Sequence, residues 1–383
     1  MNIVFVGDFY QLPPVGAKLS SSFLSERASH MVVQGLHLWQ TVAVTSVVEL
    51  TVNYRQRTDP TFFDLLERFR LGRPTVEDIE LLNTRVVYPG QPLPPNIRKA
   101  AATNKVREAS SHYSFLQYLR RNPASSTTSW LERGAIVVEA VVKGSATSRA
   151  LDASKIPYIL SLSEARWKGK FSGLLKLVVG HDYVHTKNTD VYRGLANGTM
   201  CTLQRVVLRP GANVWFEPNQ DCGGGLHIVS AKDVLCVVLK HKAQSHATAQ
   251  VYPTLSPGEF PLEPELCTKK RVTFSTCGTF TVDIFQIQLI SGSTTTGHKL
   301  QGDTLEHLML VDYGNTGYRR NKDGWLYVML SRAISLDGIY LAQPLSLSVS
   351  SYREREDVND EMTRLRILGA KTKIVYESFV TYH

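Results

Sequence analysis

The stretch TTTGHKLQGDTL, Thr294–Leu305, lies between two apolar runs, Phe285–Ile290 before it and Leu308–Val311 after it. Such runs predict strands, and α/β proteins place their ligands in polar loops at the ends of buried strands. Hydroxyls, an ammonium, an amide and two glycines together suit a polyanion, such as nucleotide phosphates or a nucleic-acid backbone. A plain polar surface loop is the alternative that this stretch alone leaves open.

The composition sets the outer limits of the interpretation. A chain of 383 residues exceeds what one hydrophobic core usually spans, so we expect two or three domains. Lys and Arg number 43 against 34 Asp and Glu, and the formal net charge of +9 favours anionic partners. Five scattered cysteines without a Cys-x-x-Cys pair indicate free thiols in a reducing compartment. Neither a membrane-spanning apolar run nor a signal peptide is recognisable, so we expect an intracellular protein.

The amino-terminal residues predict a strand that ends at a ligand-binding edge. The run from Asn2 to Val6 is apolar and β-branched, as in a buried parallel strand, and Gly7-Asp8 follows it. Gln11 comes next, held by the stiff pair Pro13-Pro14. This places an amide at the carboxyl end of a strand, although a proline-rich turn with an exposed glutamine is the alternative. Because strands rarely open a domain without a lead-in, we expect a fragment of a longer protein.

Two arginines follow apolar segments in the same manner. Arg55 comes after a predicted strand over residues 43–50, and Arg332 comes after the apolar segment 326–330. A guanidinium group binds phosphate oxygens in pairs and keeps its charge at any physiological pH. Both arginines are therefore phosphate-binding candidates, with a surface salt bridge as the alternative.

Periodicity and turn residues predict the remaining elements. Helices are expected over residues 22–29, 33–39, 59–71, 76–84 and 105–120. Short strands are expected over 174–180, 181–186, 200–208, 226–229 and 234–239, with a hairpin turn at Asn197-Gly198. Short strands separated by glycine-rich and proline-rich loops predict a small β-barrel set into the α/β chain. Residues 271–290 are expected to return to the main sheet.

In this order, the segments resemble motifs of the superfamily 1 DNA helicases of the Pif (petite integration frequency) and RecD-like branch. Residues 7–15 (GDFYQLPPV) are similar to the third motif of that family, and residues 50–56 (LTVNYRQ) to the fourth. Residues 298–304 (HKLQGDT) are similar to the fifth motif, and residues 326–333 (LYVMLSRA) to the sixth. Residues 194–199 (GLANGT) match the segment that enters a small inserted β domain.

The resemblance implies an α/β, RecA-like P-loop NTPase fold, with part of a first RecA-like domain, a complete second one and an inserted SH3-like β-barrel. The implied boundaries place the first domain at residues 1–45 and the second at 46–190 and 271–345. The inserted domain then covers 191–270, and residues 346–383 form a tail.

The implied activity is ATP-dependent DNA unwinding of the repair, recombination and telomere-maintenance class, with ATP and Mg²⁺ as cofactors and single-stranded DNA or a fork as partner. The implied nucleotide-binding residues are Gly7, Asp8, Gln11, Arg55, Gln301, Gly302 and Arg332. Among them Gln11 would sense the γ-phosphate, and Arg55 and Arg332 would stabilise charge during phosphoryl transfer, which makes these three the catalytic candidates. The implied DNA contacts are Pro13, Pro14, Thr296, His298 and Lys299. We also expect a monomer, located in the nucleus or mitochondrion if the source is a eukaryote.

The chain departs from that family in two motifs. It has no Gly-x4-Gly-Lys-Ser/Thr phosphate loop; the nearest segment, Gly292-x4-Gly297-His298-Lys299, has histidine where the loop lysine belongs. The acidic motif that holds Mg²⁺ is not recognisable either, so ATP would lack its anchor and its metal ligand. We therefore expect an amino-terminally truncated helicase without appreciable ATPase or unwinding activity alone. The alternatives are a non-catalytic single-stranded nucleic-acid-binding protein and an inactive remnant of a mobile element.

Overall fold

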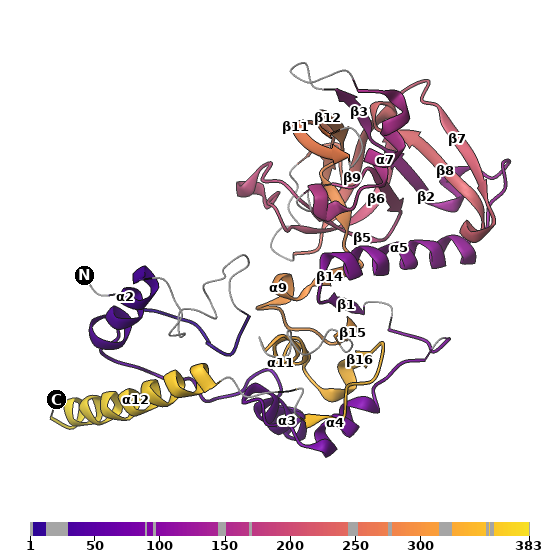
Figure 1. Ribbon diagram of the computed structural model, residues 1–383. Helices are drawn as coiled ribbons and strands as arrows, with labels where there is room; N and C mark the ends of the chain where they lie inside the picture. Colours follow the sequence, from indigo (N-terminus) through magenta and orange to yellow (C-terminus); the bar gives the residue numbers. More distant parts are fainter. Residues whose placement is uncertain are drawn as a thin grey trace. The chain divides into compact units, whose positions relative to one another are not determined.

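The computed structural model describes residues 3–12, 30–88, 90–94, 97–144, 151–167, 171–243, 252–274, 278–313, 324–349, 352 and 356–382. The chain divides into two compact units: unit 1 comprises Met1–Ala102 and Thr295–His383, and unit 2 comprises Thr103–Thr294 (Figure 1). Unit 1 mixes helices and strands, whereas unit 2 is rich in strands. Among the helices of the described ranges, none combines the length and the apolar character that a membrane span requires.

Unit 1 is organised around a four-stranded sheet in the order β14-β1-β15-β16. Its strands are β1 (Arg98–Ala101), β14 (Thr294–Thr296), β15 (Leu308–Asp312) and β16 (Ile339–Leu341). The central strand β15 pairs in parallel with β1 and with β16, so that Leu308 lies opposite both Arg98 and Ile339. The strand predicted at 308–311 is thus confirmed, and the sheet has the parallel pairing that a mixed α/β fold requires.

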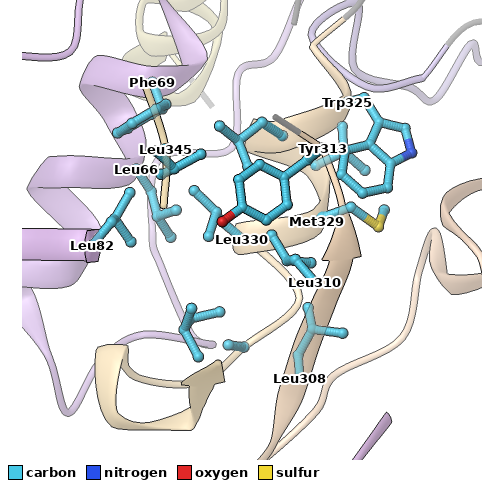
Figure 2. Close-up of a cluster of buried hydrophobic side chains, with 14 of the residues drawn as sticks. Leu66, Phe69, Leu82, Leu308, Leu310, Tyr313, Trp325, Met329, Leu330 and Leu345 are labelled. Atoms are coloured by element: carbon cyan, nitrogen blue, oxygen red, sulfur yellow. The ribbon is translucent and has the colours of Figure 1, made fainter. Parts of the chain in front are cut away.

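Helices α3 (Pro60–Arg70) and α4 (Val76–Asn83) form where local signals favour them. Asp59 accepts a hydrogen bond from the Phe62 amide, and Pro60 occupies the first turn. Thr75 and Asp78 cap α4 reciprocally. Both predicted helices are confirmed. Their apolar faces meet β15 and helix α11 (Trp325–Leu330) in one core, shown in Figure 2; its labelled members include Leu66, Phe69, Leu82, Leu308, Leu310, Met329 and Leu330.

Two strands predicted in unit 1 are wrong. Residues 3–8 and 44–54 form neither helix nor strand. Val4 and Val6 are 85% and 92% exposed, and Leu50 is 90% exposed. Apolar, β-branched composition favours a strand, but a strand forms only where a neighbouring strand pairs with its backbone. The sheets described here include neither segment.

Helices flank these two segments and contact them. Helix α2 (His30–Leu38) continues into the π-helix η1 (Trp39–Ala43), which agrees with the helix predicted at 33–39. The long carboxyl-terminal helix α12 (Glu356–Tyr382) binds this region through its polar side chains. Trp39 Nε1 donates to Glu361 Oε1 at 2.7 Å, and Arg366 forms an ion pair with Glu49 at 3.1 Å. The helix predicted at 22–29 lies outside the described residues.

Unit 2 contains three sheets, in the orders β10-β9-β6-β5-β13, β11-β12-β3 and β4-β2-β8-β7. The strands are β2 (Ala135–Glu139), β3 (Val141–Gly144), β4 (Leu174–Val178), β5 (Asp182–His185), β6 (Met200–Leu208), β7 (Val214–Asn219), β8 (Gly224–Ser230), β9 (Val234–His241), β10 (Glu259–Leu262), β11 (Glu265–Phe274), β12 (Gly278–Gln286) and β13 (Leu289–Ser291). Its helices are α5 (Asn104–Arg121), α6 (Trp130–Arg133) and α7 (Ile156–Ser161). The predictions at 105–120, 174–180, 181–186, 200–208, 226–229 and 234–239 are confirmed as α5, β4, β5, β6, β8 and β9.

The observed division of the chain differs from the predicted boundaries. Residues 103–190 were expected in the second RecA-like domain, yet β5 pairs with β6 and β2 pairs with β8, which joins them to the predicted insertion. Residues 271–290 do not return to the parallel sheet of unit 1. Instead β12 pairs antiparallel with β11 and β3, and β13 pairs with β5. Their buried alternate positions, Val282 and Ile284 among them, fit a sheet with one face in a core.

The turn at Asn197-Gly198 exists, but it does not join two strands directly. The Thr199 amide donates to the Ala196 carbonyl at 3.1 Å, and Gly198 has a φ of 102°, which glycine adopts without strain. This turn closes a longer loop between β5 and β6, so the predicted two-residue hairpin is wrong.

Candidate functional site

The Gln11 side chain is presented by a turn that is anchored on both sides. The Tyr10 amide donates to Asp8 Oδ1 at 3.0 Å, and the Gln11 amide donates to the Asp8 carbonyl at 3.1 Å. The Tyr10 ring is buried under the guanidinium group of Arg70, 4.6 Å from the ring centroid. Leu12 enters the core of unit 1. The turn is therefore held by its neighbours, and the amide of Gln11 is left at the surface.

Gln11 contacts the loop that follows helix α9 (Gly297–Leu300). Gln301 Nε2 donates to Gln11 Oε1 at 2.8 Å, and the Asp303 amide donates to the Leu300 carbonyl at 3.0 Å, which closes a turn. Gly302, in that turn, has a φ of 100°. The structure thus brings Gln11, Gln301 and Gly302 together. Of the other predicted residues of this segment, Gly7 lies in open space, since a Cβ atom built there would meet no atom of another residue within 4 Å apart from its chain neighbours; Pro13 and Pro14 lie outside the described residues.

Arg55 is positioned by an asparagine-initiated turn. Asn53 Oδ1 accepts hydrogen bonds from the amides of Arg55 and Gln56 at 3.0 and 3.1 Å. Arg55 Nε then donates to Thr304 Oγ1 at 3.0 Å, and Arg55 Nη1 donates to the Ser331 carbonyl at 3.0 Å. The remaining guanidinium nitrogen, Nη2, has no hydrogen bond to the described part of the chain. Burial lowers the pKa of Arg55, and the neighbouring Tyr327 and Asp303 oppose this effect.

Arg332 follows helix α11 and is almost fully buried, with 5% of its surface exposed. Its Nε donates to the Val328 carbonyl at 3.0 Å, and its Nη2 donates to Ser331 Oγ at 2.9 Å. Burial lowers the pKa of Arg332, and the positive charge of Arg55 lowers it further. The two guanidinium groups are therefore close enough to repel each other.

The three predicted catalytic residues thus surround one short region of unit 1. Gln11 contacts Gln301, Arg55 contacts Thr304 and Ser331, and Arg332 adjoins Ser331. The donors gathered here are amides and guanidinium groups, which suit phosphate oxygens. They are not ligands for Mg²⁺, and among the described residues no group of three or more His, Cys, Asp or Glu side chains converges on a metal position.

Sequence reasoning missed two supports of this region. Gln56 is buried and donates to the carbonyls of Ser331 and Ala333 at 3.3 and 2.7 Å, which fixes the Arg55 turn to the end of α11. Tyr327, on α11, lies beside Arg70 and Asp8. Burial raises its pKa to about 12; the positive charge of Arg70 opposes this effect, and the negative charge of Asp8 adds to it. The Asn53 side chain was the one available signal for the turn, because asparagine commonly bonds to amides two residues ahead.

The predicted strand-binding residues lie on and beside α9. His298 and Lys299 are exposed, whereas Thr296 is partly buried. Gly297 packs directly on α11: a Cβ atom there would lie 2.4 Å from Trp325 Nε1. Leu300 is completely buried in the core. One side of α9 is therefore fixed to α11, and two basic side chains are displayed on the other.

Comparison with known proteins identifies neighbours by structure alone. No protein-family model matches the chain, and no curated protein matches its sequence. A crystal structure of Pif1 helicase from Candida albicans is 20% identical, with a TM-score of 0.54, over 94% of this chain and 67% of that one. A structure of two coordinating Pif1 helicases at forked double-stranded DNA is 17% identical, with a TM-score of 0.56, over 95% and 65%.

A Pif1 helicase from Bacteroides in complex with ADP-AlF3 and single-stranded DNA is 16% identical, with a TM-score of 0.55, over 94% of this chain and 65% of that one. The chain thus spans about two thirds of the length of these structures. At such low identity the likeness concerns the fold. The described chain has a mixed α/β fold with parallel strand pairing that resembles the fold of Pif1 helicases.

Proposed function

We propose that this chain provides part of an ATP-dependent DNA helicase of the Pif1 type. Gln11, Arg55 and Arg332 would read the terminal phosphate of the nucleotide, and Thr296, His298 and Lys299 would bind the DNA strand. The observation that supports this most directly is the gathering of Gln11, Arg55 and Arg332 around the 301–304 turn and Ser331, although more than 300 residues separate the first from the last.

The chemistry required of this region is stabilisation of negative charge. A phosphoryl group in transfer carries charge on its oxygens, and fixed guanidinium donors stabilise that charge without reorganising. Arg55 is held by two hydrogen bonds and still has Nη2 to donate. The amide of Gln11, already oriented by Gln301, would orient a phosphate oxygen or the attacking water. ATP and Mg²⁺ would supply the reacting group and its counter-charge when bound.

The same region would connect strand binding to the nucleotide. Lys299 and Gln301 are two residues apart, so a bound DNA strand that moved α9 would also move Gln301, the hydrogen-bond partner of Gln11. The proposal includes the finer expectations as well: RecA-like identity for unit 1, an SH3-like barrel within unit 2, a monomeric state and an intracellular location. Single-stranded and forked DNA, and a nucleotide with Mg²⁺, are proposed by analogy with the solved Pif1 helicases.

A second candidate is a single-stranded nucleic-acid-binding protein without catalysis. It is supported by Arg332, whose guanidinium group is turned inward onto Val328 and Ser331 in this structure. The exposed His298 and Lys299 would still contact a phosphate backbone. The 383 residues contain no Gly-x4-Gly-Lys-Ser/Thr sequence, and a binding protein without catalysis does not need one.

Binding and hydrolysis assays on the purified chain separate the two candidates. We expect fluorescence anisotropy to detect binding of an oligo-dT probe, and Lys299→Met to lower the salt slope of that binding by about 0.7, the value for one lost phosphate contact to a single strand. Lys371→Met, which removes an exposed lysine from α12 of the same unit, is the matched control and should leave the slope unchanged.

Nucleotide binding is measured with a fluorescent ADP analogue. Under the helicase proposal, Arg55→Lys weakens binding about tenfold or more, because a lysine has a single nitrogen and cannot hold Thr304 and Ser331 while a further nitrogen donates to the phosphate. ATP hydrolysis stimulated by single-stranded DNA would establish a motor. DNA-strand binding that does not respond to nucleotide would establish the second candidate. If the folded wild-type chain bound neither the DNA strand nor the nucleotide, both candidates would be refuted.

A further inference from the structure

Unit 2 contains a cavity that the proposed helicase chemistry does not use. Its volume is about 180 Å³, and it lies between α5, the turn after α7, strand β4 and the end of β13. At about 30 Å³ for each water, this volume holds on the order of six water molecules. It is smaller than the cavities that take drug-sized ligands, at roughly 300 Å³ and above. A natural occupant is therefore a small molecule or one chemical group of a larger one.

A lysine, Lys176, lies in the wall of the cavity. Lys176, on β4, is half-buried, and the described part of the chain offers its Nζ neither a hydrogen bond nor an ion pair. The nearby carboxylate of Glu164 is already bound by the buried Arg107, and Glu108 lies 3.7 Å from the same guanidinium group. Burial lowers the pKa of Lys176, and the carboxylates oppose this. An ammonium group in a partly dry site gains most from an acceptor that enters the cavity.

Hydroxyl groups supply the rest of the wall. Seven of the 19 lining residues are serines, from four separate segments. Ser293 Oγ donates to Ser111 Oγ at 3.3 Å and lies 3.1 Å from Ser291 Oγ, whereas Ser163 is exposed beside the turn after α7. A hydroxyl group rotates to donate wherever an acceptor appears. Ser161 and Ser172 donate to backbone carbonyls, so hydroxyls such as those of Ser163, Ser291 and Ser293 are the ones that can turn toward a ligand. With the Glu164 carboxylate held by Arg107, these hydroxyls and the ammonium group of Lys176 have the chemistry of an oxyanion site.

We propose that this cavity binds a small phosphate-type oxyanion, with Lys176 Nζ and the serine hydroxyls as its ligands. The site belongs to unit 2 and does not rest on the proposed helicase function. The same chemical group occurs on free phosphate or small phosphate esters and at the 5′ end of a nucleic-acid strand. His112 lines the cavity on α5, and partial burial and Lys176 lower its pKa, so an arriving anion should raise it.

The first experiment titrates inorganic phosphate into the full chain at constant ionic strength, with chloride as the reference, and follows binding by calorimetry. The wild type should bind phosphate, and Lys176→Met should weaken binding at least about tenfold, the lower range for a charge-assisted hydrogen bond. Lys240→Met, which removes an exposed lysine from β9 of the same unit, should bind like the wild type.

Two further measurements keep the test decisive if Lys176→Met does not fold. Ser163→Ala changes an exposed residue and should weaken phosphate binding severalfold. Proton NMR should show the pKa of His112 rising when phosphate is added. Competition by a 5′-phosphorylated oligonucleotide, but not by its unphosphorylated form, would identify strand ends as the source; no competition would identify the free anion. Absence of phosphate binding by the wild type, or equal binding by folded Lys176→Met, would overturn the proposal.

Discussion

Replacing Arg133 by methionine should destabilise unit 2 strongly, because this arginine joins α5 to a distant loop. The residue is 4% exposed. It donates to the carbonyls of Gly225 at 2.5 Å, Cys222 at 2.7 Å and Asn122 at 2.9 Å. The loop lies directly on the helix, since a Cβ at Gly223 would come within 2.2 Å of the Leu119 carbonyl.

The size of the effect follows from the carbonyls that lose their donor. Each buried carbonyl left unpaired costs about 1–3 kcal/mol. We take about 1 kcal/mol for each of the three, because a carbonyl oxygen keeps a second lone pair and because removing a buried charge recovers desolvation energy. Arg133→Met should then lose about 3 kcal/mol of unfolding free energy, equivalent to a fall in Tm of roughly 6–12 °C for a unit of this size.

Urea and thermal unfolding of the full chain measure this loss. Arg120→Met is the matched control, because Arg120 Nε donates to the carbonyl of Asp221 in the same loop at 3.0 Å but is exposed to solvent. A single exposed contact should contribute less than about 1 kcal/mol. If the two variants lose the same free energy, the guanidinium group of Arg133 does not hold the loop on α5, and the reasoning fails.

Three other perturbations test different parts of the structure. Gly297→Ala places a Cβ atom 2.4 Å from Trp325 Nε1, so thermal unfolding should show a loss of about 1–3 kcal/mol of unfolding free energy. Fluorescence anisotropy should show a weaker affinity for single-stranded DNA. An unchanged Tm would contradict this packing. Burial alone would raise the pKa of Asp78, but hydrogen bonds from Arg68 and Thr75 hold it below its ordinary value. This carboxylate therefore stabilises the fold above about pH 5 and loses that effect as the pH falls. The unfolding free energy of Asp78→Asn, measured in urea, should depend less on pH than that of the wild type. Burial lowers the pKa of His185, so the unfolded chain takes up the proton first and the unfolding free energy should fall below roughly pH 6.5. His185→Gln should make the unfolding free energy depend less on pH in this range. An equally steep fall in both proteins would exclude His185 as its source.

Elements whose causes are local were predictable from the sequence. Helix α3 needs only Asp59, Pro60 and an apolar face at helical spacing, and all three are legible in the sequence. Strand β6 likewise agrees with the prediction at both ends. The predicted strands at 2–6 and 43–50 had equally apolar sequences, but a strand depends on a neighbour that its own residues do not specify.

The candidate site shows the same limit at the level of side chains. Gln11, Arg55 and Arg332 were chosen by residue type and by their place after apolar segments. Gln56 was not chosen, because its partners are backbone carbonyls nearly 280 residues away, and no side-chain pattern marks a carbonyl. The unit 2 cavity was missed for a related reason: its walls come from four segments, and for one of them, residues 160–164, no element was predicted.

Helix α11 is the element through which the parts of the proposed site act on one another. At its start, Gly324 approaches the Tyr10 carbonyl so closely that a Cβ would lie 3.0 Å away, and Trp325 supports Gly297 beneath α9. At its end, Ser331 accepts from Arg55 and Gln56.

The helix and the two residues that flank it, Gly324 and Ser331, therefore contact the Gln11 turn, α9 and the Arg55 turn. Every residue of α11 from Trp325 to Leu330, except the half-buried Tyr327, is buried in the core, so we expect the helix to shift as one body and not to deform. A motor built on this unit would thus couple the DNA strand to the nucleotide through the position of α11. A shift of α9 would act first on the buried indole of Trp325, which lies beneath Gly297.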